Sequence, residues 1–373
     1  MTGQGTQSGT TATQAMFRTS HTALVNITSA ALVLQNFSTK TYNSDAPFVP
    51  DTGPGAATTV TASIEYPAGT FTQIKFSGLA SGTIPNGDLL VSDYATVSIP
   101  KNAQFWTRRY YLNANAIVNQ GGNDFRVALG DATVIGTSGV ADQTLGGTVA
   151  SNTGLILFPI GIVGPSASPS VVIVGTSIAA GVGDTLDLGT VLHGYSESLT
   201  TTPQVNVAQG SATTLGWISD HPICQKMFQF CTSMLTDHGE NDYTITDTAT
   251  CLSRLQTLYA LMAGRQICQT TMLPRVAATS DGFTTLAGQS GFTDLAQQEA
   301  LNSALRSGTP NVSVLFDVDN LIETTFGGNP GYWRVATDGF GNAAPFTNDG
   351  THPQHSAHLC ILDNLAINQA LFV

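Results

Sequence analysis

The chain has 373 residues, which at roughly 150 residues per domain predicts two domains. Its hydrophobic content of 42% is enough for a folded core and excludes wholesale disorder. Acidic residues outnumber basic ones by 25 to 13, and a chain with a net charge of −12 has few groups that could neutralise phosphates, which argues against nucleic acid as a partner. Uncharged polar residues dominate instead, as is typical of secreted or cell-surface proteins that handle neutral polymers such as carbohydrate.

Short alternating and β-branched runs recur through residues 1–165, separated by Gly, Pro, Asn and Asp. Hardly any stretch of this part shows a helical period. The pattern predicts an all-β sandwich or jelly-roll-like domain over residues 1–165. The expected strands are Ala23–Val33, Val60–Tyr66, Phe71–Phe76, Ala95–Ile99, Phe105–Leu112 and Leu155–Ile160.

After a polar connector at Gly164–Ser170, strands alternate with helices. Val171–Val174 is a continuous apolar run, as expected for a buried parallel strand. The alternation predicts a three-layer α/β domain over residues 166–373, with its site at the carboxyl ends of the strands. Further strands are expected at Gln204–Ala208, Ser233–Thr236, Gln266–Leu273 and Val312–Phe316, and helices at Gln225–Cys231, Thr246–Ala263, Phe292–Arg306 and Pro353–Leu371.

Three further features bear on location and redox state. No run approaches the roughly 20 apolar residues of a membrane helix, so no membrane span is expected. The N-terminus lacks the basic and apolar regions of a signal peptide. Because a content of only 10% charged residues is unusual for a cytosolic enzyme, we expect a mature secreted or periplasmic protein, with a cytoplasmic one as the alternative. The cysteines show no Cys-x-x-Cys zinc spacing and are expected to be buried free thiols, with one or two disulfides as the alternative. They are Cys224, Cys231, Cys251, Cys268 and Cys360.

The first candidate motif directly follows the buried run Val171–Val174. It reads Gly175-Thr176-Ser177 and leads into a small-residue segment suited to a helix. This order predicts that Ser177 lies on a tight strand-to-helix turn, where N–H groups at the helix start can stabilise an anion. Ser177 is therefore a candidate nucleophile, and the alternative is that it merely caps the helix.

The second motif is Asn348-Asp349-Gly350-Thr351-His352-Pro353, just before the last expected helix. A carboxylate three residues before an imidazole can accept a hydrogen bond from its Nδ1. This contact would fix the tautomer of His352 and leave Nε2 free to take a proton from a serine. The alternative is a capped helix start with a surface histidine.

Two other turns follow expected strands and could stabilise a developing oxyanion. In His238-Gly239-Glu240-Asn241-Asp242, the amide of Asn241 can donate to such a group. In Gln209-Gly210-Ser211, the candidate is Gly210, a weaker signal because glycine after a strand is common. Ordinary turns are the alternative in both places.

Together and in this order, the four motifs resemble the sequence blocks of the SGNH (GDSL-type) hydrolase/esterase superfamily. The resemblance covers about residues 170–373 and implies that family's flavodoxin-like fold. The aspartate that usually precedes the serine is replaced by Thr176. The resemblance implies that Ser177 is the nucleophile, that Gly210 and Asn241 are oxyanion donors together with the Ser177 N–H, and that Asp349 and His352 are the orienting acid and the base.

The resemblance further implies a serine esterase that hydrolyses carboxylic esters through an acyl-enzyme intermediate, without cofactor or metal. The uncharged polar composition and the additional β domain favour an acylated glycan as substrate, with removal of acetyl groups as the reaction. Two alternatives stay open. One is a lipase or short-chain acyl esterase, and the other is a non-catalytic surface or binding protein that retains the hydrolase fold.

Histidines permit two other arrangements. His352, His355 and His358 are spaced by three, but steps of three on a helix drift by about 60° each, so all three cannot converge on one ion. Only His352 and His355 could share a metal, with the carboxylate of Asp349 as third ligand. His238 beside Asp237 could resemble a base–acid pair, but adjacent residues of a strand face opposite ways.

Residues 326–346 are rich in Gly and Asn and precede the Asp349/His352 turn. Long loops inside compact domains are usually functional. Aromatic side chains in this stretch are therefore expected to form an acyl- or sugar-binding wall, the alternative being that they fill the core beneath the loop. These side chains are Tyr332, Trp333, Phe340 and Phe346.

Overall fold

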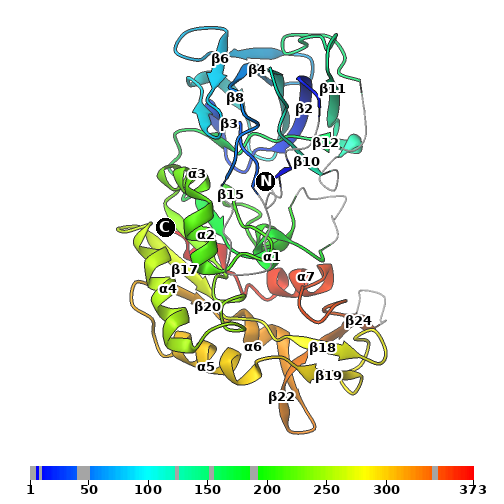
Figure 1. The fold of residues 1–373 in the computed structure, drawn as a ribbon, viewed down its shortest axis with the longest axis vertical. Helices are drawn as coiled ribbons and strands as arrows, with labels where there is room; N and C mark the ends of the chain where they lie inside the picture. Colours follow the sequence, from blue (N-terminus) through cyan, green and yellow to red (C-terminus); the bar gives the residue numbers. More distant parts are fainter. Residues whose placement is uncertain are drawn as a thin grey trace.

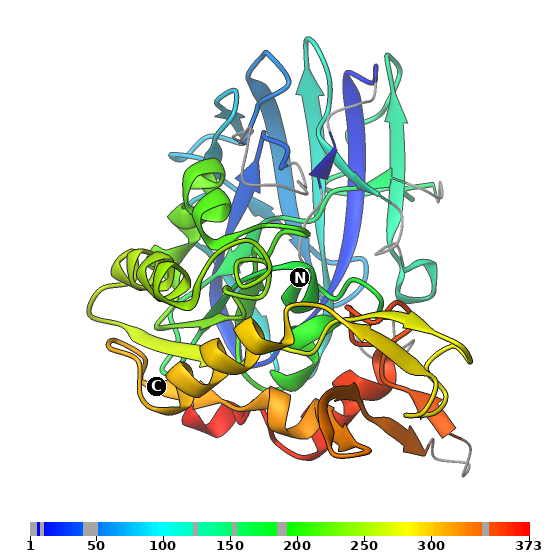
Figure 2. The ribbon, with the colours of Figure 1, turned by 60° about the horizontal axis from the view of Figure 1, so that its bottom comes forward.

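The computed structural model of the chain describes residues 6–7, 11–39, 51–121, 126–150, 155–184, 192–337 and 343–373. The N-terminal half, blue to cyan in Figure 1, lies at one end of the long axis, and the C-terminal half lies at the other. The halves remain distinct after rotation (Figure 2). Among the described residues, no helix is long and apolar enough to cross a membrane.

Antiparallel sheets make up the N-terminal half. The largest runs in the order β11 (Ala132–Gly136), β2 (Gln14–Thr22), β9 (Gln104–Asn113), β4 (Thr58–Glu65) and β5 (Phe71–Ile74), with β6 (Ser81–Ile84) also paired to β4. A second contains β13 (Gly161–Val163), β3 (Ile27–Gln35) and β7 (Leu89–Val91), with β8 (Ala95–Ile99) also paired to β3. A third contains β1 (Thr6–Gln7), β10 (Asn119–Gly121) and β12 (Leu155–Ile156).

The two larger sheets share one core, in which Phe17 of β2, Leu32 of β3 and Val60 of β4 are all fully buried. The prediction of a β-rich N-terminal half is confirmed to this extent, but β2 was not predicted. Its sequence, QAMFRTSHT, lacks an alternating pattern because it includes polar residues that the fold buries or pairs. Glu65, for example, accepts hydrogen bonds from Arg18 of β2 at 2.8 Å and from Arg108 of β9 at 2.7 Å.

The C-terminal half contains a five-stranded parallel sheet, which confirms the α/β class of this half. Its strands lie in the order β15 (Gln204–Asn206), β14 (Val171–Val174), β16 (Ser233–Thr236), β17 (Gln266–Thr270) and β20 (Val314–Phe316). Counted along the chain, this order is 2-1-3-4-5. The chain therefore changes direction across β14, and β14 and β16 flank the switch point at which ligands bind in open parallel sheets.

Alternate residues of β14 enter two different cores. Val172 and Val174 pack with α2 (Thr214–Asp220), α4 (Thr248–Ala260) and α5 (Leu295–Arg306). Val171 and Ile173 pack with α1 (Ser177–Ala180), α6 (Val318–Ile322) and α7 (His355–Asp363). Burial on both faces explains the continuous apolar run of β14. Helices α2 and α6 were not predicted, since they have only 7 and 5 residues.

The two halves are packed against each other. One buried cluster contains Val33 from the N-terminal half and Trp217 and Met227 from the C-terminal half. Beside it, Asp51 Oδ1 lies 2.8 Å from His221 Nδ1, and both side chains are buried. Because apolar burial and a buried side-chain hydrogen bond both cross the junction, we expect the halves to stabilise each other.

The substitution Met227→Ala tests this junction. The side chain of Met227 is fully buried, and a Cβ added to Gly161 would lie 2.6 Å from its Cε, so the N-terminal half packs closely on this side chain. We expect a loss of about 2–5 kcal/mol in the free energy of unfolding, measured by urea denaturation and circular dichroism. The control is Leu79→Ala, at a residue that is 67% exposed, with an expected loss of about 0.5 kcal/mol or less. Equal, small losses in both variants would contradict a shared core.

Candidate active site

Ser177 occupies the turn that the sequence predicts for it. β14 ends at Val174, and Ser177 is the first residue of α1. The hydroxyl of Thr176 caps this helix by accepting a hydrogen bond from the Ile178 N–H at 3.3 Å. Thr176 is thus the N-cap. Ser177 does not cap the helix, which was the alternative to its role as nucleophile. Ser177 is 8% exposed and lies at the carboxyl end of the strand.

A buried carboxylate from the neighbouring strand holds this turn. Asp237 follows β16, and its Oδ1 accepts the Thr176 N–H at 2.7 Å, while its Oδ2 accepts the Thr176 hydroxyl at 2.8 Å and the Ala179 N–H at 3.0 Å. A Cβ on Gly175 would collide with Asp237 Oδ1, so this approach requires glycine. Burial raises the pKa of the Asp237 carboxyl, against the effect of the hydrogen bonds that it accepts. No local pattern in the sequence predicts this role of Asp237.

His352 connects Ser177 to Asp349. Its Nε2 lies 2.9 Å from Ser177 Oγ, and its Nδ1 lies 2.6 Å from Asp349 Oδ2. Asp349 Oδ1 also accepts the backbone N–H groups of Thr351 at 2.9 Å and His352 at 2.8 Å. Partial burial acts to raise the pKa of Asp349, but the hydrogen bonds from His352 and Thr351 hold it well below its ordinary value. The three predicted residues therefore form one continuous hydrogen-bonded line.

The Asp349–His352 turn is held in place by hydrogen bonds to Gly350, which lies inside the turn. Gly350 has a φ of +75°, and a Cβ there would collide with Val276 O. Its carbonyl accepts hydrogen bonds from the Val276 N–H at 2.9 Å and from Trp333 Nε1 at 3.1 Å.

The buried position of Trp333 corrects the prediction that aromatic side chains of residues 326–346 form an acyl- or sugar-binding wall. Residues 326–346 do not form one long loop, because they include most of the hairpin of β21 (Glu323–Phe326) with β22 (Asn329–Trp333) and the pair β23 (Val335–Thr337) with β24 (Ala343–Pro345). Trp333 and Phe346 are buried in the core, and Tyr332 packs on Phe292 with ring centroids 4.5 Å apart. Phe340 lies outside the described residues.

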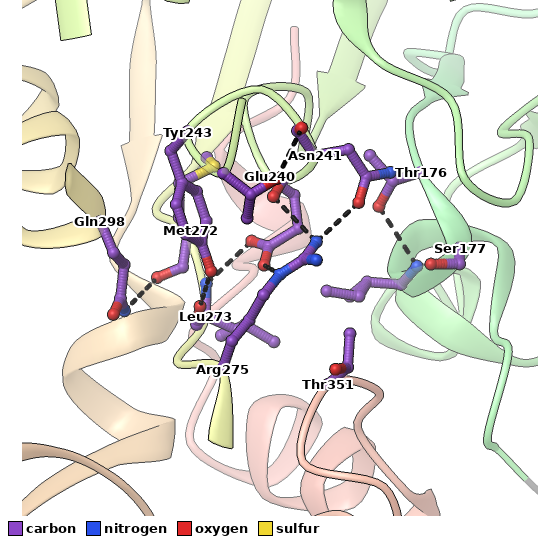
Figure 3. A network of polar contacts seen from close by, with 12 residues as sticks. Thr176, Ser177, Glu240, Asn241, Tyr243, Met272, Leu273, Arg275, Gln298 and Thr351 are labelled. Carbon is purple, nitrogen blue, oxygen red and sulfur yellow. Dashed lines mark hydrogen bonds and ion pairs between the residues drawn. The ribbon is translucent and has the colours of Figure 1, made fainter. Parts of the chain in front are cut away.

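The amide of Asn241 is oriented by contacts at both of its ends. Its Oδ1 accepts a hydrogen bond from Arg275 Nη2 at 2.6 Å, and its Nδ2 donates to Ala212 O at 3.0 Å. Figure 3 shows this amide between Arg275 and the Thr176–Ser177 turn. An amide has two N–H groups, so one remains for a ligand in front of the serine turn. Arg275 was not predicted, because no motif around it in the sequence indicates a contact with Asn241, which lies 34 residues earlier.

Arg275 is itself held by Glu240. Arg275 Nη2 donates to Glu240 O at 2.9 Å, and its Nε lies 3.6 Å from Glu240 Oε1, while Glu240 Oε2 accepts the Leu273 N–H at 2.9 Å. Burial of the side chain raises the pKa of Glu240 to about 7, although Arg275 acts in the opposite direction. The two residues lie side by side in Figure 3.

Gly210 lies in the turn after β15, at the same edge of the sheet as Ser177. The adjacent Gln209 N–H donates to Gly175 O at 2.9 Å, which attaches this turn to the serine turn. Ser211, the next residue, has a φ of 62°, so the chain bends sharply directly after Gly210.

The alternative histidine sites are not assembled. His352 contacts Ser177 and Asp349, whereas His355 Nδ1 faces Asp184 Oδ1 at 3.4 Å, so the two rings do not share a ligand. His238 is fully buried beside Trp217, and burial lowers its pKa to about 4. A buried ring of this kind does not serve as a solvent-accessible base.

The cysteines are all free thiols, as expected, and none is paired in a disulfide. Four of them are buried, and Cys360 is half-buried. Burial raises the pKa of the Cys231, Cys251 and Cys268 thiols to about 12, so these groups are not nucleophiles near neutral pH.

No protein-family model and no curated protein matches the sequence. Solved structures that are similar include a putative GDSL-like lipase from Bacteroides ovatus, at 12% identity and a TM-score of 0.33, over 95% of this chain and 82% of that one. A carbohydrate esterase family 2 enzyme with a carbohydrate-binding domain from Corynascus thermopiles has 12% identity and a TM-score of 0.33, over 98% of this chain and 95% of that one. Phospholipase A1 from Streptomyces albidoflavus has 17% identity and a TM-score of 0.30, over 54% of this chain and 99% of that one.

These three neighbours are named as a putative GDSL-like lipase, a carbohydrate esterase and a phospholipase. At such identities and TM-scores, they say nothing about the substrate or mechanism of this chain. Both depend on the geometry of the site.

The pKa of Glu240 predicts how stability varies with pH. Its folded-state pKa of about 7 lies above the ordinary value of 4.5, so the folded chain binds this proton more tightly than the unfolded chain. Its contribution is therefore present below pH 4.5 and is lost as the pH rises through about 7. Glu240→Gln should flatten this part of the stability profile by up to about 3 kcal/mol, measured by urea unfolding from pH 4 to 8.

The matched control is Glu299→Gln, at an exposed residue of α5, which should leave the profile unchanged. If Glu240→Gln lowered stability equally at every pH, Glu240 would be ionised throughout and paired with Arg275, and the expected profile would be wrong.

Proposed function

We propose that the chain is a serine esterase of the SGNH type. Its catalytic domain spans about residues 166–373 as a three-layer α/β fold, and a β-sandwich over about residues 1–165 precedes it. The observation that carries the proposal is the line from Asp349 through His352 to Ser177, with contacts of 2.6 and 2.9 Å. A carboxylate, an imidazole and a hydroxyl in this order form an activated nucleophile.

In the proposed first step, Ser177 Oγ attacks the carbonyl carbon of an ester. His352 Nε2 accepts the hydroxyl proton as the new C–O bond forms, and the ring becomes an imidazolium. Asp349 stabilises this cation, and the low pKa of the carboxyl keeps it charged throughout. The same contact presents the tautomer of His352 that has its free Nε2 directed at the serine.

The carbonyl oxygen becomes negatively charged in this step and needs donors. The proposed donors are the N–H groups of Ser177 and Gly210 and the remaining Nδ2–H of Asn241. Ser177 is the first residue of α1, and the first N–H groups of a helix have no partner inside it. Arg275 positions the amide of Asn241 by its bond to Oδ1, so we assign it as a positioning residue.

The intermediate then collapses. His352 returns the proton to the leaving alkoxide as the C–O bond to the alcohol breaks, and an acyl group stays on Ser177. Water, deprotonated by His352, then attacks the acyl carbon and releases the acid. Every proton transfer in this route uses a group of the chain, so the route needs no cofactor.

For the substrate, we propose a short acyl ester on a glycan, with an acetyl group as the first candidate. Support comes from composition, because only 10% of residues are charged and the other polar residues suit a neutral polymer. A series of p-nitrophenyl esters from acetate to octanoate, run beside acetylated xylan, tests this choice. Preference for octanoate with no release of acetate from xylan would favour a lipase instead.

Substitution of the triad tests the mechanism. Ser177→Ala and His352→Ala should each lower kcat for p-nitrophenyl acetate by at least about 10³-fold, and Asp349→Asn should lower it less, because it disturbs only orientation. The double variant of Ser177 and His352 should resemble the worse single variant, since the residues act as one unit.

Circular dichroism of each variant should match the wild type, because the changes are small and lie at turns. A folded Ser177→Ala protein that kept most of the wild-type kcat would eliminate Ser177 as nucleophile. An inactive wild type with a folded chain would favour the non-catalytic alternative.

Asn241 and Arg275 allow a graded test of the oxyanion site. Asn241→Ala should lower kcat by about 10²–10³-fold with little change in KM, because the donor acts on charge that develops in the transition state. Arg275→Lys keeps a cation beside Glu240 but loses the planar contact, so we expect a smaller fall in kcat, of about tenfold. Arg306→Lys, at a residue that pairs with Asp317 and Asp319, is the matched control and should keep the wild-type kcat. A change in KM alone for Asn241→Ala would mean that the amide only binds the ground state.

A further inference from the structure

A second cluster of polar side chains lies near the triad but takes no part in it. It consists of Asp184, after the turn that follows α1, Glu197 in the 3-10 helix η3 (Gly194–Ser198), and His355, the first residue of α7. His355 Nδ1 lies 3.4 Å from Asp184 Oδ1 and 3.5 Å from Glu197 Oε1. All three donor atoms lie within 4.8 Å of one another, so the side chains converge on one point.

The separations of these atoms differ from those of direct ion pairs. Charge-assisted N–H···O bonds have lengths of about 2.7–2.9 Å, which the 3.4 and 3.5 Å separations exceed. Two ligands bound tetrahedrally to one ion at about 2.0–2.1 Å lie about 3.3–3.4 Å apart. The observed spacing therefore fits donors arranged around a cation.

A second three-residue group, Asp51, His221 and Cys224, offers a useful contrast. In that group, Asp51 Oδ1 lies only 2.8 Å from His221 Nδ1. This distance is that of a completed hydrogen bond, which already satisfies both atoms.

The carboxylate of Asp184 provides a second, independent observation. Its side chain has no exposed surface, and its Oδ2 accepts the Gly194 N–H at 2.9 Å. Within the part of the chain that the structure describes, its Oδ1 makes no hydrogen bond and faces His355. A buried carboxylate oxygen in this situation is costly unless a cation or donor compensates for it.

The surroundings add another potential ligand. His358, one turn along α7 from His355, is 1% exposed, and its Nε2 makes no hydrogen bond to any described residue. The nearby Asp184 carboxylate acts to raise the pKa of this ring, so His358 lies within electrostatic range of the cluster. Burial lowers the pKa of His358 to about 4, which keeps the ring neutral and able to donate a lone pair.

We propose that Asp184, Glu197 and His355 bind one divalent transition-metal ion, for which Zn²⁺ is the best match. Imidazole and carboxylate are both ordinary zinc ligands, and two carboxylates would balance the charge of the ion. Ca²⁺ fits less well, because it takes six to eight oxygen ligands. The ion would be structural, and the proposed ester hydrolysis does not pass through it.

The position of the cluster suggests what the ion does. Asp184 follows the helix that starts at Ser177, and His355 lies three residues after His352. A cation shared by Asp184 and His355 would tie the nucleophile's segment to that of the base and so preserve the Ser177–His352 contact. This consequence rests on the proposed function, whereas the binding of the ion does not.

The test is titration of the full chain with ZnCl₂ by isothermal calorimetry, after dialysis against EDTA and then against buffer. We expect one equivalent to bind and the thermal midpoint of unfolding to rise with Zn²⁺, because an ion that binds the folded state stabilises it. Asp184→Asn, which keeps an acceptor for Gly194, and His355→Gln should each weaken binding by at least about tenfold.

Cys224→Ser is the matched control, because it disables the other three-residue group and should leave the stoichiometry and affinity unchanged. Loss of binding in Cys224→Ser with retention in Asp184→Asn would overturn the proposal, as would a folded wild-type chain that binds no Zn²⁺. Calorimetry does not depend on turnover, so failure of this site and failure of the esterase proposal give separate results.

Discussion

The buried carboxylate of Asp237 is the interaction on which the candidate site depends. It joins β16 to the turn after β14 by accepting two N–H groups and one hydroxyl from Thr176 and Ala179. The carboxylate comes from the residue that follows β16, and the turn after β14 supplies the hydroxyl, that of Thr176. These contacts hold the turn on which Ser177 lies.

The order of the parallel sheet brings the other groups to the same place. β14 and β16 are neighbours at the switch point, so the residues that follow them share one edge although about 60 residues separate them in the sequence. The Asp349–His352 turn reaches that edge from the far end of the chain and is fixed there by Trp333 and Val276. The N-terminal half shares a buried cluster with the C-terminal half, so we expect it to stabilise this arrangement.

Local sequence was sufficient to predict the positions of residues that have their partners nearby in the chain or that follow a strongly apolar strand. Ser177 follows a run buried on both faces, and Asp349 lies three residues from His352, so both positions were predictable. Arg275 and Asp237 act through contacts across 34 and 61 residues, which no local pattern shows. The prediction of an aromatic binding wall before the Asp349–His352 turn was wrong for a physical reason. An aromatic side chain can line a binding site or fill a core, and Trp333 is fully buried and donates a hydrogen bond to the Gly350 carbonyl.

The most direct test of the central claim, that Ser177 is an activated nucleophile, is labelling with a fluorophosphonate probe followed by mass spectrometry of the digested chain. The contact of His352 with Ser177 predicts one covalent adduct per chain, on the peptide that contains Ser177, and no adduct after His352→Ala. An unlabelled wild-type chain, or an adduct on a different serine with Ser177 unmodified, would contradict the account.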